Sequence, residues 1–127
     1  MHIRDLIDEV NRSVEELDLV AARKYIEENL EILNEQKTHL KRNARELLKV
    51  LTEMQKSGYK PLSRQELSII QTINSYASKF DLRGLKILVK DNAQLLLRED
   101  VLAYLNADAK IILEGMGAIV NHSGASK

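Results

Sequence analysis

The sequence predicts an all-α fold of about six helices, and three observations support this prediction. Only five Gly and one Pro occur among 127 residues, so few positions break a helix. Leu, Ile, Val and Ala dominate the apolar residues, and charged residues make up 30% of the chain. Apolar residues also recur three and four positions apart, which is the spacing of one helix face. At this length we expect a single domain, spanning residues 1–120.

Three helices are predicted in the first half of the chain. The first follows an apolar stripe over residues 3–17. The second begins after Asp18, whose carboxylate can accept hydrogen bonds from the free amides of the next turn, and its stripe covers residues 19–33. The third carries a stripe over residues 40–54, and Gly58 is suited to end it in a left-handed conformation.

A break between helices is predicted in the segment SGYKPLSRQE, residues 57–66. Pro61 disfavours a helical conformation at the residue before it. Ser63 and Glu66 match the S-x-x-E capping box that begins a helix. Three more apolar stripes follow, over residues 67–80, 82–96 and 101–112. The last residues, 121–127, have no periodicity and are expected to be disordered.

The two halves of the chain resemble each other when the sequence is shifted by 63 positions, and no gap is needed over about fifty positions. Asp18 aligns with Asp81. Three asparagines also align with asparagines: Asn11 with Asn74, Asn29 with Asn92, and Asn43 with Asn106. We therefore expect two duplicated three-helix units, residues 1–58 and 63–118. They would stack as a short α-solenoid-like or bundle domain, because neither unit buries its apolar faces alone.

The stretch DLVAARKYIEENLEIL, residues 18–33, resembles the second helix of a tetratricopeptide repeat. The residues that match the family pattern are Asp18, Leu19, Ala22, Tyr25, Ile26 and Leu30. Asn29 stands where the family usually has Ala, and a looser copy begins at Asp81. The resemblance covers about sixteen residues per unit. It implies a stack of helical hairpins that holds peptides or partner proteins, and it implies no enzyme.

Charge and composition exclude several classes of protein. Nineteen Lys and Arg balance nineteen Asp and Glu, so no net field attracts a nucleic acid or an anionic membrane. Cysteine is absent, which excludes disulfides, thiolate catalysis and Cys-ligated metal sites. The beginning of the chain has no signal-peptide pattern, and no apolar run reaches the ~18 residues of a membrane span. We therefore expect a soluble cytoplasmic protein that does not contact a membrane.

The sequence contains no catalytic or metal-binding pattern. Its three His are scattered, and no second His lies at helical spacing from any of them. Adjacent carboxylates such as Glu15 and Glu16 splay apart on a helix instead of converging. No nucleophile–base pair, phosphate loop or dinucleotide motif occurs. We therefore predict that the protein is not an enzyme and holds no metal or cofactor.

Asn29 and Asn43, two of the paired asparagines, are the first candidate binding residues. Asn29 lies on an apolar stripe, although Asn is a mediocre helix former. An amide in a groove can donate to and accept from the backbone of an extended peptide. The alternative is that these amides satisfy hydrogen bonds between helices or fix their register.

Lys41, Arg42 and Arg45 are the remaining candidate binding residues. They belong to the basic segment KTHLKRNAR, in which Lys37, Lys41 and Arg45 are expected to share one helix face. Such a cluster can hold an acidic peptide, a carboxylate or a phosphate backbone. The alternative is a solvated helix face. The aligned segment of the second half lacks these charges, so the basic face is not duplicated.

The predicted function is a non-catalytic helical-repeat module that binds a protein or peptide partner, with acidic peptides among the candidates. Two alternatives remain open. Residues 61–85 can imitate the helix-turn-helix of a DNA-binding transcription regulator, although the zero net charge disfavours nucleic acid. Apolar runs such as LSII and QLLL in the second half favour a purely structural homodimeric bundle.

Overall fold

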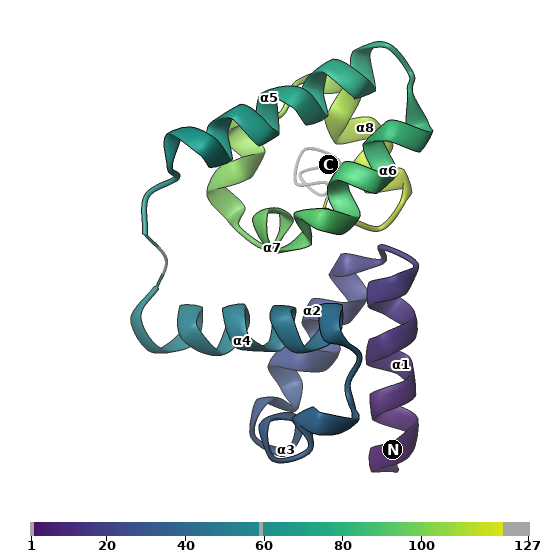
Figure 1. The fold of residues 1–127 in the computed structure, drawn as a ribbon, viewed down its shortest axis with the longest axis vertical. Helices are drawn as coiled ribbons and strands as arrows, with labels where there is room; N and C mark the ends of the chain where they lie inside the picture. The colour runs from purple at the N-terminus through teal and green to yellow at the C-terminus, as the bar shows by residue number, and fades with distance from the viewer. Residues whose placement is uncertain (1, 59, 121–127) are drawn as a thin grey trace, which may run out of the picture.

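The computed structural model describes residues 2–58 and 60–120, and every regular element in these ranges is a helix (Figure 1). The all-α prediction is therefore confirmed. The first half, residues 2–58, contains α1 (Ile3–Glu15), α2 (Leu19–Glu28), α3 (Leu30–Glu35), the 3-10 helix η1 (Lys37–His39) and α4 (Arg42–Ser57). The second half, residues 60–120, contains α5 (Arg64–Ser78), α6 (Leu82–Asp91), α7 (Ala93–Leu96), the 3-10 helix η2 (Glu99–Tyr104) and α8 (Ala107–Gly115). The expected disorder of residues 121–127 falls outside the described residues.

The predicted number of about six helices is too low, because two expected helices are interrupted at an asparagine. Asn29 follows α2 with φ −135° and ψ 31°, and Asn92 follows α6 with φ −130° and ψ 33°. The side-chain amide of Asn29 donates to the Tyr25 carbonyl at 2.8 Å, and that of Asn92 donates to the Leu88 carbonyl at 3.0 Å. Each bond satisfies a carbonyl that the ending helix leaves free. A short new helix, α3 or α7, begins at the next residue.

The turns that end α1 and α5 are both Schellman turns. In each, the amide of the residue after the turn donates to the carbonyl five residues earlier, at 2.9 Å. The left-handed position of such a turn favours Gly, yet it holds Leu17 (φ 62°) and Phe80 (φ 57°). Leu17 is buried, whereas Phe80 is 73% exposed. Only Leu17 therefore gains core packing in return for the strained backbone.

The capping signals of the sequence are confirmed. The Asp18 carboxylate accepts from the Ala21 amide at 3.4 Å and begins α2. Ser63 and Glu66 form the reciprocal capping box of α5, with bonds of 3.1 and 2.8 Å. Gly58 ends α4 with φ 72°. These residues act on amides within three or four positions, so their effect on the helix ends is local.

The last helices of the two halves differ most. The bounds of α2 and α6 differ by 63 residues at both ends, but α4 has 16 residues and α8 has nine. In the second half η2 occupies part of the corresponding segment. Asn106 then begins α8, where its carbonyl oxygen Oδ1 accepts from the Ala109 amide at 2.8 Å. The backbone turns at Gly117, with φ 81°, soon after α8 ends.

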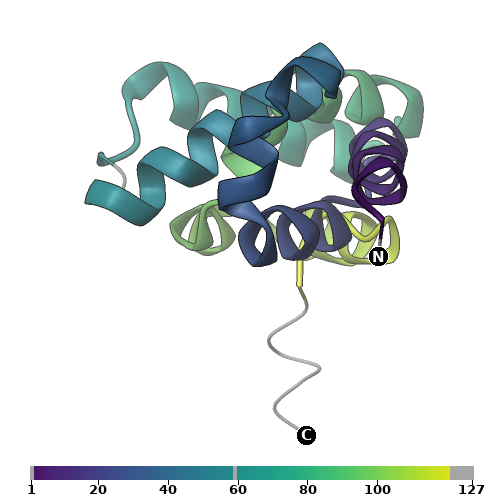
Figure 2. The same cartoon turned by 90° about the horizontal axis from the view of Figure 1, so that it is seen from below.

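The two halves pack against each other along α2, α4 and α7. Figures 1 and 2 show α1 running along the long axis of the molecule and α4 running across it, with α7 next to α4. The Val20 amide donates to the Gly117 carbonyl at 2.9 Å, and the Arg23 guanidinium donates to the Leu97 carbonyl. Buried apolar residues of both halves form one core cluster. This packing creates the hollows at the boundary between the halves.

Candidate binding groove

A groove of about 560 Å³ lies where α4 meets the junction of α6 and α7. This volume falls within the range of about 300–1,000 Å³ that is typical of ligand pockets. Apolar side chains of Leu47, Val50 and Ala93 form part of its lining. The polar lining comes from both halves: Arg42, Asn43, Glu46, Lys90, Asp91 and Gln94. The groove therefore combines an apolar surface with charged and amide groups.

The polar side chains of the groove have no hydrogen-bond or ion-pair partner within the ranges that the structure describes. Two cations and two carboxylates leave the lining with no net charge, which disfavours a polyanion such as a nucleic acid backbone. Asn43 on α4 and Gln94 on α7 each offer donors and an acceptor. A polypeptide segment, which carries both donors and acceptors, fits this mixture of groups.

The beginning of α4 is fixed by α1, and this contact sets which residues enter the groove. The Lys41 amide donates to Asn11 Oδ1 at 2.9 Å, and Lys41 is extended, with φ −68° and ψ 160°. The helix therefore begins at Arg42 and places Arg42 and Asn43 in its first turn. Glu46 and Val50 follow Asn43 at three and seven positions, so they share its helix face.

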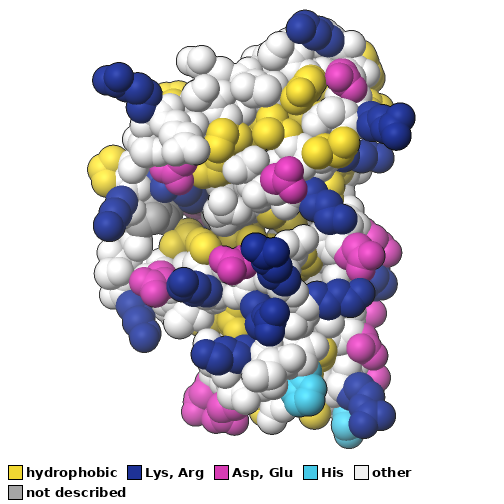
Figure 3. Space-filling model, in the orientation of Figure 1, with side chains coloured by type: hydrophobic (Ala, Val, Ile, Leu, Met, Phe, Trp, Pro, Cys, Tyr) yellow, Lys and Arg dark blue, Asp and Glu magenta, His cyan; other side chains and the backbone are white. Residues whose placement is uncertain are grey.

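The expectation that Lys37, Lys41 and Arg45 share one helix face is wrong. Lys37 belongs to η1, and the chain is extended at Lys41, so no single helix carries these three residues. Lys41 Nζ instead pairs with Glu15 Oε2 of α1 at 3.2 Å. Arg45 is exposed on α4 and does not belong to the groove lining. Figure 3 shows Lys and Arg side chains gathered around α4, with Asp and Glu among them.

The candidate residues thus divide into three groups. Arg42 and Asn43 line the groove. Lys41 and Arg45 are exposed outside it. Asn29 lies between α2 and α3, where its amide caps the end of α2. The alternative interpretation of Asn29, as a residue that satisfies helical hydrogen bonds, describes its observed contact.

Four residues of the groove were missed by the sequence argument: Glu46, Lys90, Asp91 and Gln94. Glu46 follows Asn43 by three positions, so helical spacing from Asn43 was a signal that could have found it. The other three lie at the junction of α6 and α7, about half a chain away from α4. No local pattern connects them to α4, because only the packing of the two halves brings them together.

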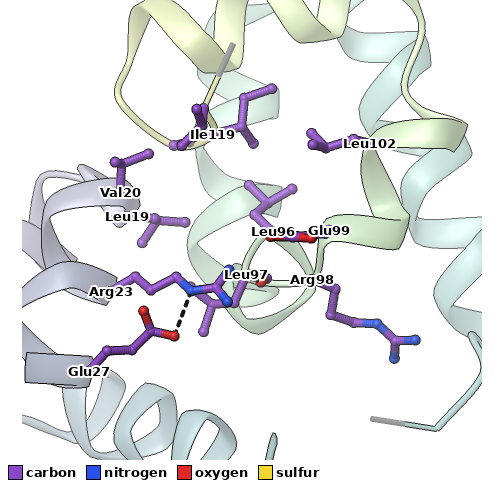
Figure 4. Close-up of a pocket in the computed structure, with 12 residues that line it drawn as sticks. Leu19, Val20, Arg23, Glu27, Leu96, Leu97, Arg98, Glu99, Leu102 and Ile119 are labelled. Atoms are coloured by element: carbon purple, nitrogen blue, oxygen red, sulfur yellow. Dashed lines mark hydrogen bonds and ion pairs between the residues drawn. The ribbon is translucent and has the colours of Figure 1, made fainter. Parts of the chain in front are cut away.

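Another hollow, of about 290 Å³, lies between α2, the segment from α7 to η2, and residues 118–120 (Figure 4). Its wall is mainly apolar, and its cations already have partners. Arg23 bonds to Glu27 at 3.0 Å and to the Leu97 carbonyl, and Arg98 bonds to Asp100 at 2.8 Å. We interpret this hollow as part of the packing between the halves, because these cations are occupied within the chain.

Other kinds of site find no support in the described part of the chain. No group of three or more His, Asp or Glu is arranged there to hold a metal ion. No helix within residues 2–58 and 60–120 has the length and apolar character needed to cross a membrane. Comparisons with family models, curated proteins and solved structures found no match for this chain.

Proposed function

We propose that this protein is a non-catalytic module that binds a peptide segment of a partner protein in the groove between α4 and the α6–α7 junction. The observation that carries the proposal is the set of polar side chains without partners around the apolar surface of this groove. Asn43 and Gln94 would pair with the peptide backbone. Arg42 and Lys90 would bind acidic side chains of the peptide, and Glu46 and Asp91 would bind basic ones.

The proposal includes a repeat architecture, in which the two halves are copies of one helical unit. Three local features that recur 63 residues apart support it: the left-handed residue of the Schellman turn, the Asp cap and the Asn break. In repeat proteins, grooves between stacked units are the usual binding surface. The tetratricopeptide-like hairpin stack remains part of this proposal.

Peptides selected from a random phage-displayed library on the purified protein would test the proposal. Binding of a labelled selected peptide is then measured by fluorescence anisotropy. Because each lost hydrogen bond removes about 0.5–1.5 kcal/mol, the double substitution Asn43→Ala with Gln94→Ala should weaken binding by about tenfold.

A matched pair of arginine variants provides the control. Arg42 and Arg45 are both exposed on α4, but only Arg42 lines the groove. Arg42→Ala should weaken the binding of acidic peptides, and Arg45→Ala should leave it unchanged. If the groove variants bind every selected peptide as tightly as Arg45→Ala does, the groove is not the binding site and the proposal fails.

A DNA-binding regulator is the second candidate, and one observation favours it. α5 and α6 are joined by only three residues, and α6 exposes Arg83, Lys86 and Lys90. A gel-shift assay with random duplex DNA would detect such binding, which should weaken steeply as the salt concentration rises. Absence of any shift at low salt would remove this candidate.

A further inference from the structure

α6 carries an exposed face with cations in its centre and apolar residues at both edges. A helix turns by one residue in 3.6, so Arg83 and Lys86 lie next to each other, between Leu82 on one side and Ile87 on the other. All four are exposed, Ile87 by 59% and Leu82 by 40%. We call this surface the α6 face and include Phe80, which precedes the helix. Figure 3 shows apolar side chains at the surface of the half that contains α6.

The same helix face is an interface in the first half. Val20 and Arg23 of α2 precede Arg83 and Lys86 by 63 residues. The Val20 amide and the Arg23 guanidinium donate to carbonyls of the second half, so this part of α2 is covered. Arg83 and Lys86 have no ion-pair or hydrogen-bond partner for their side chains in the described ranges. A helix face that one half uses for docking is thus left open in the other.

Phe80 adds an independent observation. Its left-handed backbone favours Gly, and its side chain is 73% exposed, so Phe contributes little to the core at this position. A large aromatic residue held at a strained, exposed position is typical of a binding anchor.

The chain also carries a surface of opposite charge. Glu31 and Glu35 of α3 are exposed beside Ile32, which is 41% exposed. Neither carboxylate has a partner among the residues described. We call these three residues the α3 face. Figure 1 places α3 at one end of the long axis and α6 in the other half, so one molecule can present both faces at the same time.

We propose that the α6 face of one copy binds the α3 face of a second copy, head to tail. Arg83 and Lys86 would pair with Glu31 and Glu35, while the apolar residues of both faces contact each other. Two α6 faces would repel each other because both are basic. The two faces are different surfaces, so the contact is heterologous and leaves one face of each kind free at the ends of an assembly. Apolar edges suit a protein partner better than a phosphate backbone.

The first test is the mass of the full-length protein, measured by sedimentation velocity over a range of concentrations. We expect the mean mass to rise above that of a monomer as concentration increases. It should fall when the ionic strength rises from about 0.01 M to about 1 M, because the Debye length shrinks from about 30 Å to about 3 Å. A monomer at all concentrations in low salt would overturn the proposal.

The second test reverses the charges of each face. The variant Arg83→Glu with Lys86→Glu, and the variant Glu31→Lys with Glu35→Lys, should each weaken self-association by about tenfold or more. An equimolar mixture of the two should associate again, because the reversed faces complement each other. Lys49→Glu, an exposed change on α4, is the matched control and should associate like the wild type.

Three results of the second test would overturn the proposal: reversed variants that associate like the control, a mixture that does not recover, and a monomer whose DNA binding is lost with Arg83 and Lys86. The last result would assign the α6 face to nucleic acid. The mixture also excludes misfolding as the cause of lost association, because a misfolded variant could not complement its partner. Lys90, which lines the proposed peptide groove, is unchanged in all variants, so this test is separate from that of the groove.

Discussion

Replacing Gly84 by Ala should destabilise this protein, although Ala is the better helix former. A Cβ atom at Gly84 would lie 2.9 Å from Asp81 Oδ2 and 3.0 Å from Tyr76 Cε1. Both distances are shorter than the contact of about 3.5–4.0 Å between carbon atoms. Asp81 cannot turn away freely, because its Oδ1 accepts from the Gly84 amide at 3.0 Å and caps α6.

The size of the effect follows from two opposing contributions. Overpacking by one methyl group costs about 1–3 kcal/mol. Ala in place of Gly within a helix gains about 1 kcal/mol. We therefore expect Gly84→Ala to lower the free energy of unfolding by about 1 kcal/mol.

The first half of the chain indicates how the clash can be relieved. Ala21 and Ser13 occupy the positions 63 residues before Gly84 and Tyr76. The Asp18 carboxylate also lies farther from the Ala21 amide, at 3.4 Å. A small residue in place of Tyr76 should therefore make room for the methyl group. In a Tyr76→Ser background, Gly84→Ala should be neutral or stabilising.

Urea unfolding of the four proteins, followed by far-ultraviolet circular dichroism, gives the free energies and completes a double-mutant cycle. We expect a coupling of about 1 kcal/mol or more between positions 76 and 84. A coupling below about 0.5 kcal/mol would refute the reasoning, since independent sites add within that limit. So would a single Gly84→Ala variant that is more stable than the wild type.

Three further predictions concern stability. Phe80→Gly should raise the unfolding free energy by about 0.5–1 kcal/mol at high salt, since it relieves a left-handed position, whereas Leu17→Gly should lower it because Leu17 is buried; urea midpoints decide both. Ser13→Ala should raise it by about 1 kcal/mol in the same assay, because the buried Ser13 hydroxyl has no partner in the described part of the chain. Hydrogen bonds from Arg98 hold the pKa of Asp100 below its usual range, so the carboxylate stabilises the fold above its unfolded-state pKa and this contribution is lost as pH falls through the folded-state pKa. Unfolding midpoints between about pH 5 and pH 2 should fall less steeply in Asp100→Asn than in the wild type, and equal slopes would contradict this.

The ends of several helices could be predicted from the sequence because they depend on neighbouring residues. Asp18, Ser63 and Gly58 act on amides and carbonyls within a few positions, and the structure places each of them at the predicted helix end. Asn29 was harder to interpret. The apolar spacing continues across it from Ile26 to Leu33, so periodicity alone does not reveal that α2 stops there.

The sequence by itself determined the helical class, the caps and the absence of cysteine chemistry, since these follow from composition and from contacts between near neighbours. Only the tertiary structure decided which polar residues meet in a groove. Arg42 and Arg45 look alike in the sequence, yet only Arg42 lines the groove. The reason is geometric: three residues turn a helix by about 300°, and the side that matters is set by how α4 packs against α6 and α7. That packing joins residues about half a chain apart, a relation that no local pattern encodes.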